Sequence, residues 1–168
     1  TSSSNTWKEL INDLSKKRTV YAIDFRGHGN SDNFDSYMWS DLSEDILFFI
    51  EKIIKAPFDL IGHSLGACIA SEVASLSKYD VKKLILEDPP FFHARRVGTE
   101  GVSKRFSYNL ELSKSSNSMD DIYKKLSENT KLSNVKNLDI IAEDLSNLDY
   151  KVLEETIDGS ALSNFNPL

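Results

Sequence analysis

Several features that mark particular protein classes are scarce in this sequence of 168 residues. A single cysteine, Cys68, excludes an internal disulfide framework and fits a reducing compartment such as the cytoplasm. No apolar run approaches the roughly 18 residues that a membrane-spanning helix needs. The formal net charge is −6 and the basic residues form no cluster, which argues against nucleic acid and anionic membranes as partners. No feature indicates an oligomeric state.

The first 90 residues alternate between helical and strand-like patterns. Apolar residues at helical spacing predict helices within 5–17, 40–54 and 64–78. Short runs rich in β-branched and aromatic residues predict strands at 18–25, 58–63 and 81–88, the first of them buried. Strands separated by helices imply right-handed crossovers. Residues 1–90 are therefore predicted to form an α/β unit with a parallel sheet and flanking helices.

The pattern changes after the proline pair at 89–90. No further apolar strand follows, whereas 118–130 and 134–148 show helical periodicity and the serine-rich stretch 113–118 is typical of a loop. The second domain, 91–168, is therefore predicted to be a helical cap over the ends of the sheet.

The stretch GHSLG places Ser64 between Gly62 and Gly66, where a predicted strand turns directly into a helix. A turn this sharp strains the backbone of its central residue, and glycines on either side would avoid steric clashes. The hydroxyl would then lie at a helix N-terminus, where free N–H groups favour developing negative charge. The alternative interpretation is an ordinary serine N-cap in a glycine-bracketed turn.

Two motifs in this order, DFRGHGNSD at 24–32 and GHSLG at 62–66, resemble the α/β-hydrolase superfamily in its cap-bearing, esterase-like branch with a serine nucleophile. The first motif matches the D-x-R-G-x-G-x-S-D loop that follows the family's fourth strand. The resemblance covers the whole chain, densely from Trp7 to Pro90, and implies a helical lid after the sixth strand.

The resemblance also implies roles for individual residues. Ser64 would be the nucleophile, and the Leu65 backbone N–H would contribute to the oxyanion hole. His63 would shape the elbow and contact the substrate, while Phe91 and Phe92 would line an apolar substrate pocket or simply pack beside the lid.

Other candidates are weaker. His28 belongs to a loop that is mainly structural in relatives, and His93 is a possible pocket residue. Asp88 ends a strand where some relatives carry the catalytic acid, although a buried turn aspartate is the favoured interpretation. Cys68, one turn past the serine, is best explained as a core residue.

The family's triad runs Ser, Asp or Glu, then His, yet no histidine follows His93. The chain is therefore expected to be an internal piece of a longer hydrolase and inactive alone, or a remodelled descendant without catalysis. The parent enzyme would hydrolyse small esters, thioesters or amides through an acyl-enzyme, without a metal or organic cofactor.

Two further alternatives stay open. A non-catalytic small-ligand-binding or interaction module could keep the elbow as a scaffold, which the missing acid and histidine favour. A GDSL-like or flavodoxin-like protein with an accidental motif would show no strand-to-helix elbow at Ser64.

Overall fold

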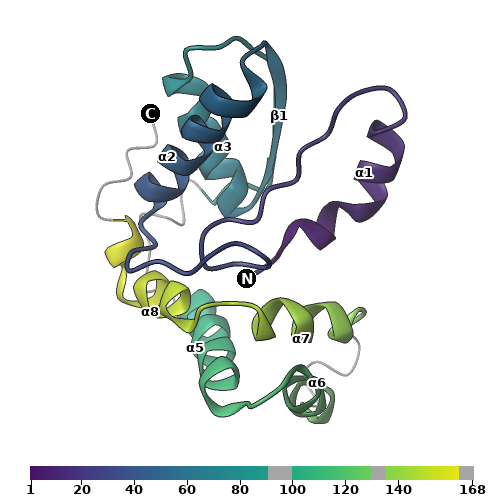
Figure 1. Cartoon of the computed structure of the whole chain (residues 1–168). Coiled ribbons are helices and arrows are strands. Elements are labelled where there is room, and N and C mark those ends of the chain that lie inside the picture. Colours follow the sequence, from purple (N-terminus) through teal and green to yellow (C-terminus); the bar gives the residue numbers. More distant parts are fainter. Residues whose placement is uncertain (91–99, 130–134, 163–168) are drawn as a thin grey trace. The chain divides into compact units, whose positions relative to one another are not determined.

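The computed structural model describes residues 1–90, 100–129 and 135–162, with the backbone alone for 100–103 (Figure 1). Backbone contacts divide the chain into two compact units. The first comprises Thr1–Asp35 and Lys104–Glu154, and the second comprises Ser36–Ser103 and Glu155–Leu168.

The second unit contains a two-stranded parallel sheet. Strands β1 (Phe58–His63) and β2 (Val81–Glu87) pair in a register that places Gly62 beside Leu86 and His63 beside Glu87. Helix α3 (Leu65–Leu76) connects the strands and covers one face of the sheet. The predicted strands at 58–63 and 81–88 and the helix between them are confirmed, as is the parallel arrangement.

Helix α2 (Trp39–Phe49) packs against α3, and a π-helical turn, η2 (Ile50–Ile54), continues it (Figure 1). Buried apolar side chains from both helices form this core: Trp39, Leu42, Ile46, Ile50, Ala67, Cys68, Ile69, Ala70 and Val73. A hydrogen bond from the Ser43 hydroxyl to the Glu72 carboxylate links the two helices inside the unit. The unit also includes the 3-10 turn η4 (Ser160–Leu162).

The first unit is helical. It begins with η1 (Ser4–Trp7) and α1 (Lys8–Leu14), and it includes most of α5 (Glu100–Ser115), all of α6 (Met119–Glu128) and α7 (Leu138–Ser146), and the start of α8 (Tyr150–Asp158). Helices α6 and α7 pack against each other. Buried side chains at helical spacing hold this layer together: Leu112, Ile122, Leu126, Ala142, Leu145, Val152 and Leu153. The predicted helical character of the second half is confirmed, although α5 extends into the predicted loop at 113–118.

The predicted buried strand at 18–25 is wrong. This segment has no regular secondary structure, and Tyr21 and Ile23 are 50% and 40% exposed. A strand needs a partner for its ladder hydrogen bonds. Within the described ranges the sheet consists of β1 and β2 alone, so no strand there pairs with this segment.

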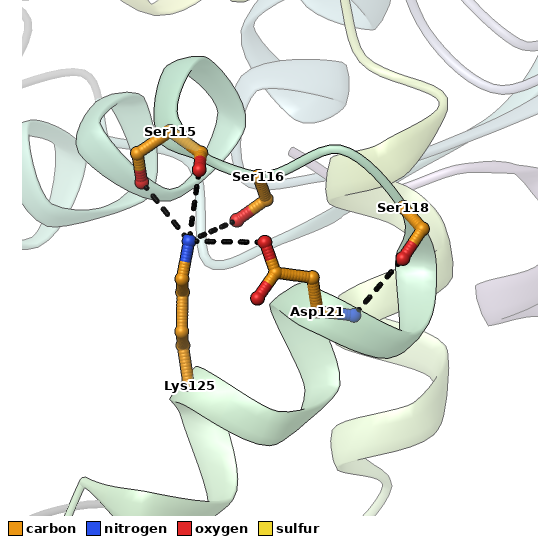
Figure 2. A network of polar contacts seen from close by, with 5 residues as sticks. All are labelled: Ser115, Ser116, Ser118, Asp121 and Lys125. Carbon is orange, nitrogen blue, oxygen red and sulfur yellow. Dashed lines mark hydrogen bonds and ion pairs between the residues drawn. The ribbon is translucent and has the colours of Figure 1, made fainter.

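The Lys125 side chain links the end of α5 to the start of α6 through hydrogen bonds (Figure 2). Its ammonium group donates to the Ser115 carbonyl at 2.9 Å and lies 3.1 Å from both the Ser116 hydroxyl and the Asp121 carboxylate. The Ser118 hydroxyl caps α6 by accepting from the Asp121 N–H. The short turn between the helices is therefore fixed by one cation and a helix cap.

Replacing Lys125 by Met should lower the unfolding temperature by about 3 °C, because the chain loses hydrogen bonds from a charged donor. Thermal unfolding followed by circular dichroism measures the shift. Lys124→Met, on the same helix, is the matched control and should leave the temperature unchanged. An equal shift of the unfolding temperature in both variants would show that the Lys125 hydrogen bonds do not stabilise the protein.

Candidate active site

Ser64 forms a strained elbow between β1 and α3. Its φ of 51° and ψ of −119° lie in a region that non-glycine residues rarely adopt, at a cost of about 1–3 kcal/mol. The Ser64 N–H donates to the Glu87 carbonyl of β2 at 2.8 Å, and the Ser64 carbonyl accepts from the Ala67 N–H at 3.0 Å. Hydrogen bonds to the sheet and to the helix therefore hold this backbone on both sides. The elbow excludes the interpretation of an accidental motif, which predicted no such turn.

The structure gives different explanations for glycine at the two positions that flank Ser64. A Cβ at Gly62 would lie 2.2 Å from the Gly66 carbonyl oxygen, so the close approach of strand and helix requires glycine there. A Cβ at Gly66 would meet nothing within 4 Å among the described residues. The predicted steric reason is thus confirmed for Gly62, while Gly66 contributes the backbone that Gly62 approaches.

The Ser64 side chain makes no capping hydrogen bond to α3, so the alternative of a serine N-cap is wrong. In the described part of the chain, neither the Leu65 N–H nor the Gly66 N–H donates to a backbone carbonyl. The first N–H groups of a helix have no intrahelical acceptor. A half-buried hydroxyl and two amide donors without a described backbone acceptor therefore share the start of α3.

Asp88 follows β2 directly and has a φ of 47°. Because Glu87 accepts the Ser64 N–H, the parallel register brings Ser64 and Asp88 to the same edge of the sheet. The Asp88 side chain is exposed, so the favoured sequence interpretation of a buried turn aspartate is wrong. No sequence signal predicts this positive φ, because a following proline favours an extended backbone with negative φ.

His63 lies on the other side of the sheet from α3. The Cβ position of Gly62 points at α3, and successive residues of a strand point to opposite faces. His63 is exposed on that opposite face, next to Glu87 of β2. Phe91, Phe92 and His93 lie outside the described residues, so their predicted roles stay predictions.

The loop at 24–32 is closed by its own hydrogen bonds. The Asp24 carboxylate accepts from the Ser4 N–H at 2.6 Å and from the Asn30 N–H at 3.0 Å, while the Ser31 hydroxyl donates to the Asp24 carbonyl. Gly29 has a φ of +52°, and a Cβ there would lie 2.4 Å from the Asp24 carboxylate. These contacts give the loop the structural role that the resemblance implied.

His28 is buried inside this loop, with 4% of its surface exposed. Its Nδ1–H donates to the Arg26 carbonyl at 3.0 Å, and its ring meets Phe25 edge-on. Burial lowers the pKa of His28 from 6.5 to about 4. The imidazole is therefore neutral at pH 7 and bonded to the backbone, which fits a structural residue rather than a general base.

This shift predicts a pH dependence of stability. A histidine with a lower pKa in the folded state releases its proton on folding, so acid favours the unfolded chain. The contribution of His28 should be fully present above about pH 6.5, decline as the pH falls, and be lost below about pH 4, a change of about 3 kcal/mol. Urea unfolding of the unmodified chain and His28→Gln at pH 7 and pH 4 measures it. If the free energy of unfolding falls equally between pH 7 and pH 4 in the unmodified chain and in His28→Gln, the acid sensitivity does not come from His28.

Cys68 is a core residue, as predicted. It is fully buried on α3, and burial raises the pKa of its thiol to about 11, so the thiol stays protonated. In the part of the chain that the structure describes, no group of three or more His, Cys, Asp or Glu side chains could hold a metal ion. Of the helices described there, none is long and apolar enough to cross a membrane.

Solved structures of esterases share this fold. The chain superimposes on an esterase from a marine microorganism with a TM-score of 0.72 and 21% identity, covering 99% of this chain and 68% of that one. An esterase from Exiguobacterium antarcticum gives a TM-score of 0.64 at 21% identity, with 98% and 63% covered.

Curated relatives are similar over shorter stretches. The 2-(acetamidomethylene)succinate hydrolase of Mesorhizobium japonicum is 38% identical over 80 residues, which span 47% of this chain and 28% of that protein. The pimeloyl-[acyl-carrier protein] methyl ester esterase of Hamiltonella defensa is 36% identical over 73 residues, or 42% and 26%. The model of the family described as alpha/beta hydrolase fold matches residues 1–150. Together with the elbow and the parallel strands, this match shows that the chain belongs to the α/β-hydrolase family.

Proposed function

We propose that this protein is a serine hydrolase that cleaves small carboxylic esters, thioesters or amides, with Ser64 as the nucleophile. The observation that carries the proposal is the elbow itself, where an uncapped hydroxyl sits at the start of α3 in a strained conformation. Hydrolases and esterases among the relatives support the reaction class. The protein is proposed to act in the cytoplasm on a small-molecule acyl substrate.

In the proposed mechanism the Ser64 hydroxyl attacks the substrate carbonyl while a histidine takes its proton. The oxyanion that forms accepts a hydrogen bond from the Leu65 N–H, which is preorganised at the helix start. Collapse of the tetrahedral intermediate expels the alcohol, thiol or amine, which takes a proton from that histidine. Water then hydrolyses the acyl-enzyme by the same steps and regenerates Ser64.

The histidine is proposed to come from polypeptide beyond residues 1–168. His28 is buried and bonded to a backbone carbonyl, His63 lies on the sheet face away from α3, and His93 lies outside the described residues. Since the relatives are longer than this chain, their extra length can hold such a residue. The 168 residues alone should then be inactive, and activity is expected from the product of the complete gene.

Asp88 is proposed to be the acid that orients this histidine. It is exposed, lies at the same sheet edge as Ser64 and has a strained backbone, which is a common property of functional residues. In the complete gene product, Asp88→Asn should lower kcat by about 10⁴-fold, because an amide does not hold the required histidine tautomer. Asp80→Asn, just before β2, is the control. Equal activity of Asp88→Asn and the unmodified protein would exclude Asp88 from this role.

Residues 1–90 are proposed as the partial hydrolase core and 91–168 as a helical cap that admits substrate. His63, Phe91 and Phe92 are proposed to contact the acyl group. A panel of p-nitrophenyl esters with acyl chains of two to eight carbons, an acyl thioester and an anilide tests the substrate class. Hydrolysis of at least one member by the complete gene product is expected. A folded protein that hydrolyses none of them would refute the proposal.

A further inference from the structure

Strand β2 has an exposed outer edge in the second unit. It pairs with β1 on its inner side, and within the described ranges no strand pairs with its outer side. Leu84 and Ile85 in the middle of β2 are 40% and 50% exposed, and Lys83 and Glu87 on either side of them are exposed as well. An edge strand presents main-chain N–H and C=O groups to which another strand can bind. The outer edge of β2 is therefore a surface on which a further strand can pair.

At a sheet edge the sequence of β2 is self-complementary in charge. Residues 82–88 read KKLILED, so two basic residues precede and two acidic residues follow an apolar centre at Ile85. When two copies of this strand run antiparallel with Ile85 opposite Ile85, Lys83 of each copy lies opposite Glu87 of the other. Opposite charges at directly opposed positions stabilise a sheet, whereas like charges destabilise it. A second copy of β2 therefore fits this edge better than a strand without this charge order.

The main-chain hydrogen bonds of β2 agree with this pairing. The Glu87 carbonyl accepts the Ser64 N–H at the end of β1 at 2.8 Å, so the main-chain polar groups of Glu87 point toward β1. Because these groups alternate between the two sides of a strand, those of Leu84 and Leu86 point to the outer edge. In the antiparallel arrangement Leu84 of one copy lies opposite Leu86 of the other. These two residues then form a hydrogen-bonded pair on each side of Ile85.

We propose that the chain forms a two-fold symmetric dimer through antiparallel pairing of β2 with β2 of a second copy. The two-fold axis is perpendicular to the sheet and passes between the two Ile85 residues, so the same patch serves both copies. Lysines on an edge strand often prevent such pairing, but here each Lys83 meets an acidic residue of the second copy. The interface is short, so we expect a weak dimer that forms between about 10 µM and about 1 mM protein. This inference goes beyond the proposed hydrolysis and does not depend on Ser64 chemistry.

Sedimentation velocity of the 168-residue chain over this concentration range measures the association. The parent chain should shift from monomer to dimer as its concentration rises. Lys83→Glu and Glu87→Lys should each weaken the dimer by more than about tenfold, because both place like charges opposite each other. Lys8→Glu, at an exposed position of α1, is the control. It changes the net charge in the same way as Lys83→Glu and should dimerise like the parent.

Mixing the two charge reversals gives a sharper test. In equal amounts, Lys83→Glu and Glu87→Lys chains should form a heterodimer as tight as the parent dimer, since opposite charges then face each other at both positions. A chain that carries both substitutions should dimerise with itself for the same reason. A parent chain that stays monomeric over the whole concentration range would overturn the proposal. A dimer that both single variants form as well as the parent, or that their mixture does not restore, would overturn it too. Circular dichroism checks the fold, and if one single variant fails to fold, the other decides.

Discussion

Replacing Ser64 by Ala should lower the hydrolytic kcat of the complete gene product by about 10⁴-fold or more. The hydroxyl is the group that forms the acyl-enzyme, and nothing else at the start of α3 can take its place. The backbone of the elbow should survive, because its hydrogen bonds come from main-chain atoms of Ser64 and not from the hydroxyl. Hydrolysis of p-nitrophenyl acetate measures the effect.

The control for Ser64→Ala is a check that the variant keeps its fold and stability. Circular dichroism and urea unfolding should show a fold that is as stable as the parent, because the Ser64 hydroxyl makes no capping hydrogen bond and alanine keeps the same backbone strain. Residual activity within about tenfold of the parent, from a folded Ser64→Ala protein, would place the chemistry elsewhere.

Gly62→Ala should be the most destabilising single methyl group that can be added at the elbow. The new Cβ would lie 2.2 Å from the Gly66 carbonyl oxygen and 2.7 Å from the Ala67 nitrogen, so β1 and α3 must move apart. We expect a loss of about 3 kcal/mol or more in the free energy of unfolding, at the upper end for overpacking. Urea denaturation of the chain measures it.

Gly66→Ala is the matched control, because the same methyl group four residues later, at the start of α3, meets no described atom within 4 Å. Gly66 also has an ordinary helical φ, so alanine should leave stability unchanged or raise it by about 0.4–1 kcal/mol. Equal destabilisation by both substitutions would contradict the asymmetry between the two glycines.

The parts of the fold that depend on local pattern were predictable from the sequence. The strand at 58–63, the helix after it and the strand at 81–88 form one crossover unit, whose apolar periodicity and turns are contained in a single stretch. The segment 18–25 has an equally good local pattern, yet no strand among the described residues pairs with it. Strand formation depends on such a distant partner, which a short run of residues does not specify.

The candidate site was predictable to the same extent. The elbow follows from GHSLG at a strand-to-helix junction, because the steric requirement is local. The exposure and positive φ of Asp88, where the chain leaves β2, did not follow from the sequence, which favoured a buried turn aspartate.

Covalent labelling tests most directly whether the Ser64 hydroxyl is an activated nucleophile. A fluorophosphonate probe reacts with serine only where a neighbouring base and an oxyanion site assist it. Incubation of the complete gene product followed by mass spectrometry of its peptides should find one label per molecule, on the peptide that contains Ser64, and none in Ser64→Ala. A folded protein that stays unlabelled, or that carries the label on another serine, would contradict the account.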